Sequence, residues 1–148
     1  MCIRKAAVGD VSRIAEIFVF NNRVNFFPIF KDENFSFGDL QVISLADEYL
    51  KKEEILSHIY VFDDGLIRGF VQMEQREICK LYVDPFFQGA GIGKALIEYA
   101  VKELHGEYLW ALEKNTRAVS FYQRQGFRLT GERKFEEDTT EYLIKLQR

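Results

Sequence analysis

The segment Gln88-Gly89-Ala90-Gly91-Ile92-Gly93-Lys94 contains three glycines in a stretch of five residues. An apolar run ending at Val83 precedes the segment, and apolar residues at helical spacing follow it. Glycine lets a backbone approach a ligand closely because no Cβ intervenes. The first amides of a helix lack internal partners and lie at the positive end of the helix dipole. Residues 88–94 are therefore typical of a loop whose backbone amides bind a phosphate group.

The spacing of these glycines does not fit two common nucleotide sites. A dinucleotide fingerprint Gly-x-Gly-x-x-Gly that begins at Gly89 requires a third glycine at the position of Lys94. A P-loop that ends in Gly93-Lys94 requires glycine at position 88 and serine or threonine at position 95, where the chain has Gln88 and Ala95. The spacing that the segment does satisfy is Gln-x-x-Gly-x-Gly.

The elements that must position this loop follow from the periodicity of the apolar residues. Asp10 and Asn115 are candidate N-caps, and residues 20–38, with their asparagines, proline and glycine, are predicted to form a loop. The predicted strands are 3–7, 59–62, 66–73, 77–85, 108–112, 127–130 and 142–146, and the predicted helices are 11–18, 40–56, 92–104 and 115–126. This order predicts a single α/β domain over residues 1–148, with a mixed sheet and helices on its faces.

Composition narrows the class of protein. The 148 residues carry 20 Lys and Arg against 23 Asp and Glu, a formal charge of −3, which argues against a nucleic-acid partner. Two cysteines and two histidines are too few for a disulfide framework or a metal cage, so we expect no metal. No apolar stretch approaches the roughly 18 residues of a membrane span, and the N-terminal segment becomes polar too soon for a signal peptide. We therefore expect a cytoplasmic protein that does not bind membranes.

The chain resembles the GNAT superfamily of N-acetyltransferases, whose diphosphate-binding signature is Gln or Arg-x-x-Gly-x-Gly or Ala. A second family motif, an asparagine at a helix start and a Phe-Tyr pair before Gly-Phe, matches the residues Asn115, Phe121, Tyr122, Gly126 and Phe127. The resemblance covers residues 77–127 at motif level and residues 3–146 in element order. It implies a mostly antiparallel central sheet with helices on both faces and a splayed strand pair that forms the cleft for coenzyme A.

The resemblance also implies which residues form the site. Acetyl-CoA would be the co-substrate, its diphosphate bound by the loop amides and its pantetheine arm paired with the splayed strand as an additional strand would be. Tyr122 would lie near the sulfur and donate a hydrogen bond to the developing thiolate. Glu77 is the first candidate for the general base, and Glu74 is the second. The residues assigned to acetyl-CoA are Leu81, Tyr82, Val83, Gln88, Gly89, Ala90, Gly91, Ile92, Gly93, Lys94 and Asn115.

The resemblance further implies direct transfer of an acetyl group to a primary amine within a ternary complex, and this amine could belong to a small molecule, a peptide or a protein. In the family, the first two helices and the last hairpin form the acceptor pocket. Here these segments carry the residues Phe26, Phe27, Phe30, Phe35, Glu136, Glu137 and Asp138. We hypothesise that the carboxylates attract a cationic acceptor and the rings hold its apolar part; core rings and a solvated acidic loop are the alternative. A non-catalytic acyl-CoA-binding module is the alternative function, and homodimerisation is left open.

Overall fold

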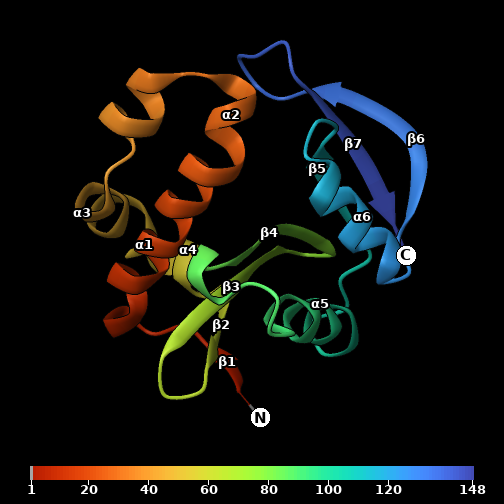
Figure 1. Cartoon of the computed structure of the whole chain (residues 1–148). Helices are drawn as coiled ribbons and strands as arrows, with labels where there is room; N and C mark the ends of the chain where they lie inside the picture. Colours follow the sequence, from red (N-terminus) through yellow and green to blue (C-terminus); the bar gives the residue numbers. More distant parts are fainter. Residues whose placement is uncertain (1) are drawn as a thin grey trace.

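The computed structural model describes residues 2–148, and Met1, the first residue of the predicted domain, lies outside them. Within these residues, seven strands form one sheet in the order β1-β2-β3-β4-β5-β7-β6 (Figure 1). All neighbouring strands are antiparallel except β4 and β5, which are parallel. The predicted α/β architecture with a mixed, mostly antiparallel sheet is confirmed.

The strands are β1 (Ile3–Lys5), β2 (Ile59–Asp63), β3 (Ile67–Glu74), β4 (Glu77–Val83), β5 (Tyr108–Leu112), β6 (Arg128–Phe135) and β7 (Tyr142–Gln147). The α-helices are α1 (Val11–Asn21), α2 (Phe27–Phe30), α3 (Val42–Leu45), α4 (Glu53–Leu56), α5 (Ile92–Lys102) and α6 (Thr116–Arg124). Shorter 3-10 and π segments are η1 (Val8–Asp10), η2 (Asn22–Phe26), η3 (Asn34–Asp39), η4 (Ala46–Leu50) and η5 (Pro85–Phe87). No helix in residues 2–148 has both the length and the apolar character that a membrane span requires.

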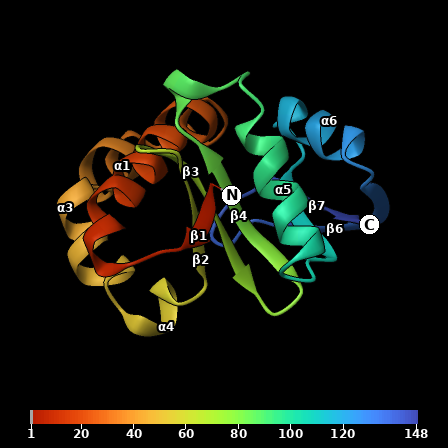
Figure 2. The same ribbon diagram turned by 90° about the horizontal axis from the view of Figure 1, so that it is seen from below.

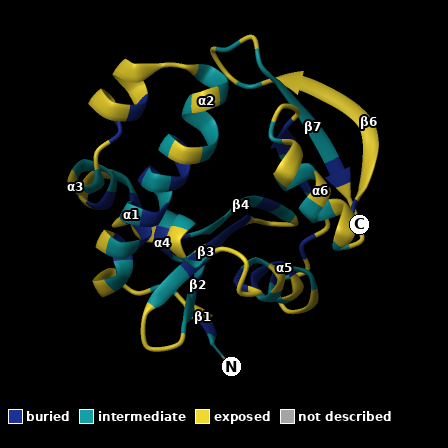
Figure 3. Ribbon diagram, in the orientation of Figure 1, coloured by how far each residue is buried: buried dark blue, intermediate teal, exposed yellow. Residues whose placement is uncertain are grey.

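Helices cover both faces of the sheet, with α1 and α3 on one side and α5 and α6 on the other (Figure 2). Two apolar clusters fill the spaces between helices and sheet. One joins Phe70 of β3 to Ile14 of α1, and the other joins Val71 of β3 to Leu96 of α5. Because both of its faces are covered, β3 is buried continuously from residue 69 to residue 73 (Figure 3). This two-sided packing makes β3 and β4 the central strands of the molecule.

The prediction of a loop over residues 20–38 is wrong, because most of this segment is helical. Helix α1 runs into the π segment η2, which is followed by α2 and then by η3. Asparagines interrupt the apolar period, but they are buried and paired: Asn21 donates to the Ile17 carbonyl at 2.9 Å, and Ser36 donates to Asn22 Oδ1 at 2.8 Å. Buried polar groups that satisfy one another can occupy helix faces where the sequence pattern leads one to expect a loop.

The remaining elements follow the predictions closely, with two differences. The helix expected over residues 40–56 is observed as α3, η4 and α4: η4 continues α3 directly, and the extended backbone of Lys52 (φ −63°, ψ 131°) separates α4 from them. Strand β6 is longer than the predicted 127–130, and it is exposed along its whole length at the edge of the sheet (Figure 3).

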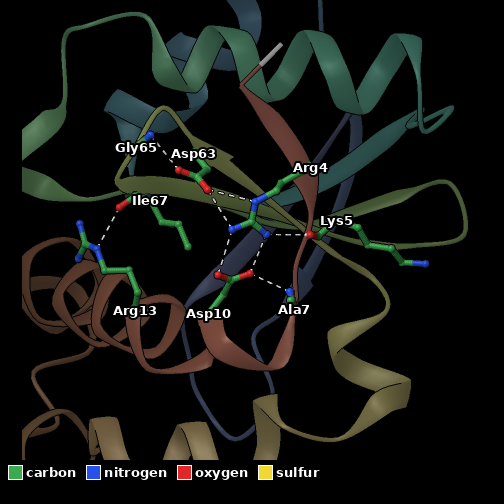
Figure 4. A network of polar contacts seen from close by, with 8 residues as sticks. All are labelled: Arg4, Lys5, Ala7, Asp10, Arg13, Asp63, Gly65 and Ile67. Carbon is green, nitrogen blue, oxygen red and sulfur yellow. Dashed lines mark hydrogen bonds and ion pairs between the residues drawn. The ribbon is translucent and has the colours of Figure 1, made fainter.

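A polar cluster joins β1, β2 and the start of α1 (Figure 4). The Arg4 guanidinium donates to both carboxylate oxygens of Asp10, at 2.8 and 3.0 Å, and to Asp63 Oδ2 at 3.0 and 3.1 Å. Asp10 also accepts the Ala7 amide at 2.7 Å, but it accepts no amide of α1. Asp10 thus occupies the predicted N-cap position of α1, but its side chain makes no capping hydrogen bond, and its carboxylate ties the entry of α1 to the first strand instead. Its hydrogen bonds with Arg4 lower the pKa of Asp10.

We predict that Asp10→Asn lowers the free energy of unfolding by about 1 kcal/mol at neutral pH, because it loses the charge-assisted hydrogen bonds with Arg4. The folded-state pKa of Asp10 lies below the value of about 3.9 expected in the unfolded chain. The contribution is therefore fully present above that value and is lost as the pH falls through the folded-state pKa. Urea unfolding should show a smaller difference between the two proteins at about pH 2 than at neutral pH.

Asp47→Asn is the matched control for this prediction. Asp47 lies 3.9 Å from Lys51 in an exposed pair, which is expected to contribute little to stability. An equal loss of stability in both variants would show that general charge, and not the Arg4 cluster, is responsible.

Candidate functional site

Strands β4 and β5 separate almost as soon as they meet. Their only paired residues in the part of the chain that the structure describes are Glu77 and Tyr108. On its other side, β4 is irregular: Gln72 of β3 faces Lys80 and Met73 faces Ile78, so Cys79 is an extra, bulged residue. A bulge bends a strand and increases its local twist. The predicted splayed strand pair is therefore confirmed.

The splay opens into a cleft of about 580 Å³. Its walls are β4, residues 87–94, β5, α6, the helical segment from α1 to α2, and the turn between β6 and β7. Every residue assigned to acetyl-CoA except Ala90 lines this cleft, and so does Tyr122. The two candidate bases, Glu77 and Glu74, do not line it. The structure thus brings together the loop, the strand edge and the tyrosine that the sequence analysis selected from three separate segments.

The amides of residues 88–94 have no protein partners among the described residues, and all of these residues except Ala90 line the cleft. The first hydrogen bond of α5 runs from the Ala95 amide to the Gly91 carbonyl at 3.0 Å. None of the amides from Gln88 to Lys94 donates to an acceptor within residues 2–148. Gly89 and Gly91 both have φ of 83°, a left-handed conformation that L side chains rarely adopt. The chain direction at these glycines leaves a row of unpaired donors at the start of α5, which is suited to binding a diphosphate.

A buried ion pair fixes the chain just before this loop. Asp84, whose side chain is 4% exposed, lies 2.7 Å from Arg13 of α1. Asp84 also accepts the Phe86 amide at 2.9 Å, and Arg13 donates to the Ile67 carbonyl at 2.9 Å. A carboxylate buried this deeply is costly unless it is paired and hydrogen-bonded. The pair therefore holds the end of β4 and the start of the loop against α1.

Asn21 is a site residue that the sequence analysis missed. Its side-chain amide donates to the Val83 carbonyl at 2.9 Å and accepts from Asn25 at 3.0 Å, and both asparagines line the cleft. One of the backbone groups at the splayed edge of β4 is therefore already paired, which reduces the number left for a ligand strand. The only sequence signal for this residue was a pair of asparagines after an apolar helix. That signal could not predict a contact with Val83, which lies 62 positions away.

Two phenols face the cleft. Tyr122 of α6 packs edge-on against Phe121 and Phe127, and its hydroxyl has no hydrogen-bond partner among the described residues. Burial raises the pKa of Tyr122, so the phenol stays protonated at neutral pH and can donate. Burial also raises the pKa of Tyr82, and the nearby Tyr122 and Glu136 raise it further. Both groups are therefore neutral donors.

Asn115 has the N-cap geometry that was predicted. Its side-chain oxygen accepts the Ala118 amide at 3.3 Å, and the residue also lines the cleft beside β5. Helix capping explains why an asparagine stands at the start of α6. Because Asn115 also lines the cleft, it can contact a ligand there as well.

Glu77 lies at the closed end of the cleft, in the one residue pair that joins β4 to β5, and does not line the cleft. The neighbouring Cys79 does line it. Burial, and then the Glu77 carboxylate, raise the pKa of Cys79 to about 11, which keeps this thiol protonated and unreactive at neutral pH. No group of three or more metal-ligating side chains occurs within residues 2–148.

The structure separates the candidate acceptor residues into two groups. Phe26, Phe30 and Glu136 line the cleft. The other four do not line it: Phe27 packs edge-on against Phe37 at 5.1 Å, and Phe35, Glu137 and Asp138 are exposed. Further lining residues that the sequence analysis did not select are Asn25, Lys80, Trp110, Arg117 and Arg124.

Comparison with known proteins gives matches of two kinds. The family model described as an acetyltransferase (GNAT) domain matches residues 56–129. Peptidyl-lysine N-acetyltransferase YjaB from Salmonella typhimurium is 40% identical over 63 residues, which cover 43% of this chain and 43% of that protein. Peptidyl-lysine N-acetyltransferase YiaC from Escherichia coli is 40% identical over 68 residues, 45% of this chain and 47% of that protein. These matches span less than half the length of the curated relatives.

Solved structures resemble the chain over nearly its whole length. Apo-form YjaB from Escherichia coli superposes with a TM-score of 0.78 at 21% identity, covering 98% of this chain and 95% of that one. The PaiA N-acetyltransferase from Thermoplasma acidophilum, in complex with coenzyme A, gives a TM-score of 0.67 at 20% identity and covers 99% and 98%. At this level of identity the likeness shows the fold, and the fold predicted from the resemblance is confirmed.

Proposed function

We propose a function from the premise that the chain belongs to the GNAT family of acetyltransferases, whose model matches half of its residues. The protein moves an acetyl group from acetyl-CoA to a primary amine, by direct transfer in a ternary complex. The observation that carries the proposal is the row of unpaired amides at residues 88–94 beside the opening between β4 and β5. A diphosphate with a long flexible arm fits this combination, since the amides bind the phosphates and the strand edge binds the arm.

Residues of three elements would hold acetyl-CoA, which supplies the activated acetyl thioester. The amides of residues 88–94 bind its diphosphate, with Lys94 close by at the start of α5. The β4 edge from Leu81 to Val83, which does not pair with β5, offers backbone groups to the pantetheine arm. Asn115 faces the same space from the start of α6.

Tyr122 is proposed to donate a hydrogen bond to the sulfur as negative charge develops there. Its raised pKa supports this role, because a phenol that stays protonated is a constant donor. Full proton transfer from an ordinary phenol of pKa about 10 to a thiolate of pKa about 8.5 is already uphill by about 2 kcal/mol, and burial of Tyr122 makes it less favourable.

We propose a lysine side chain of a peptide or protein as the acceptor. The names of the two bacterial relatives, peptidyl-lysine N-acetyltransferases, support this choice. A lysine amine of pKa about 10.4 costs about 4–5 kcal/mol to deprotonate at neutral pH, so a base or a water relay is required. Glu77 remains the proposed base, although it would act from the closed end of the cleft and through water. A cytoplasmic location remains a prediction, and homodimerisation remains open.

The first experiment tests whether the protein binds acetyl-CoA and turns it over. Acetyl-CoA at about 100 times its Kd should stabilise the fold by about 2.7 kcal/mol in thermal unfolding, and NAD and ATP should not. With a panel of amines, release of the free thiol should follow, and should be fastest with lysine peptides. Binding without thiol release would favour the non-catalytic acyl-CoA-binding module, and no stabilisation by acetyl-CoA would contradict both functions.

The second prediction concerns the loop. Gly91→Ala should weaken acetyl-CoA binding by about tenfold, because alanine disfavours the left-handed backbone that directs the amides into the cleft. Gly65→Ala is the control, since Gly65 also has positive φ (109°) and open space around its Cα but lies in the turn between β2 and β3. Isothermal titration should show reduced affinity in the first variant only. Equal affinities would mean that the loop amides do not bind the ligand.

The third prediction concerns turnover. Tyr122→Phe should lower kcat by about 10- to 100-fold with little change in the KM for acetyl-CoA, because the hydrogen bond to sulfur strengthens in the transition state. Tyr99→Phe, at a tyrosine that packs on Tyr60 outside the cleft, should leave kcat unchanged. In the wild-type enzyme, kcat should not fall as the pH passes about 10, because burial raises the pKa of Tyr122. Unchanged turnover in Tyr122→Phe would remove this residue from the mechanism.

A further inference from the structure

We propose that Glu136 binds the ammonium group of the acceptor and so selects amines that are carried on an apolar stem. This inference rests on the proposed acetyl transfer and names the substrate class of the same cleft. Of the three acidic residues 136–138 that were candidates for attracting a cationic acceptor, it selects one, and it assigns that carboxylate a position in the cleft.

Glu136 is the only acidic residue that lines the cleft in the part of the chain that the structure describes. It follows the end of β6, in the turn that leads to β7, and is half-buried. The next two acidic residues of the run, Glu137 and Asp138, are exposed and do not line the cleft. A cation inside the cleft therefore meets one carboxylate on the protein.

Hydrogen bonds within the turn fix the position of this carboxylate. The Glu136 amide donates to the Glu141 carbonyl at 2.8 Å, and the Thr139 amide and hydroxyl donate to the Glu136 carbonyl at 3.0 and 2.9 Å. The Glu137 amide donates to Glu136 Oε1 at 3.1 Å. The second oxygen, Oε2, has no hydrogen-bond partner within residues 2–148 and can accept a hydrogen bond from a ligand.

Within residues 2–148, three other carboxylates of the same region form ion pairs, and Glu136 does not. Glu132 lies 3.3 Å from Lys145, Glu141 lies 2.7 Å from Lys114, and Glu113 lies 3.1 Å from Arg133. Among the described residues Glu136 forms no ion pair. A half-buried carboxylate without a cation is incompletely neutralised, and a bound ammonium group would complete it.

Aromatic rings line the same cleft as this carboxylate. Phe26, Phe30, Tyr82 and Trp110 line the same cleft, together with Leu143. The Glu136 carboxylate is also one of the charges that raise the pKa of Tyr82. Such rings pack against an alkyl stem and attract a cation through their faces.

The cleft also contains cations, and their arrangement leaves Glu136 accessible. Lys80 is directed toward the Phe18 ring, with its Nζ 5.6 Å from the ring centroid, and it forms no ion pair within residues 2–148. Lys94, Arg117 and Arg124 come from α5 and α6. The carboxylate comes from the β6–β7 turn, whereas these three cations come from the helices on another wall of the cleft.

Glu136→Gln tests the proposal, with Glu137→Gln as a control that loses the same charge one residue away. The acceptor probe is Nα-acetyl-lysine amide, and Nα-acetyl-norleucine amide serves as the matched ligand without an ammonium group. In the presence of saturating coenzyme A, Glu136→Gln should weaken binding of the lysine compound by about tenfold in an NMR titration, and Glu137→Gln should not. The affinity for the norleucine compound should be the same in the wild-type protein and in both variants.

Kinetics provide a second readout. Glu136→Gln should raise the KM for a lysine peptide by about tenfold with little change in kcat, and Glu136→Asp should recover part of the loss. Glu77→Gln, which tests the proposed base, should lower kcat instead, and raising the pH should reduce that defect because more of the amine is neutral.

Each outcome decides between distinct explanations. Equal lysine affinity in wild type and Glu136→Gln overturns the proposal, and so does an equal loss in Glu136→Gln and Glu137→Gln, which would indicate diffuse attraction by the acidic run. Absence of lysine binding by the wild-type protein also overturns it. Lysine binding that depends on Glu136 without any thiol release would instead contradict the proposed transfer and leave the Glu136 site in place.

Discussion

The early separation of β4 from β5 is the constraint on which the rest of the structure depends. After Glu77 pairs with Tyr108, the two strands diverge in the middle of a seven-stranded sheet. An interior strand edge normally pairs along its length, because unpaired buried backbone groups are costly. The protein satisfies part of this edge through Asn21, which donates to the Val83 carbonyl. The remaining groups face a cleft, and a ligand that runs along β4 as a strand would complete the sheet.

Packing at the closed end of the cleft determines where the strands separate. A Cβ on Gly106 would lie 2.9 Å from Ile78 and 3.1 Å from the Ala100 carbonyl, so only glycine lets the α5–β5 connection pass this close to β4. One residue beyond Ile78, the bulge at Cys79 changes the course of β4. At the open end, the buried pair of Asp84 with Arg13 holds β4 against α1. Both ends of β4 are thus fixed, and the opening between them does not depend on a ligand.

Local sequence signals predicted the elements whose residues are close together in the chain. The apolar runs of β2 and β3, the glycine loop before α5 and the Asn115 cap each involve positions a few residues apart, and the structure has all of them. Contacts between distant segments were missed. Asn21 and Asn22 broke the apolar period and led to the prediction of a loop, whereas each is buried and paired with a residue well separated along the chain, Val83 and Ser36 respectively.

The carboxylates show the same limit in the candidate site. The family resemblance selected Glu77, but whether a side chain on β4 faces the cleft depends on the bulge at Cys79 and on the strand across from it. Glu136 and Glu137 are adjacent in the sequence and identical in type, and only the curvature of the β6–β7 turn separates a cleft residue from an exposed one. Residue type therefore indicated a site with amide donors, a phenol and a carboxylate. Which carboxylate takes part is set by tertiary structure, through the positions of strands that meet only at one residue pair.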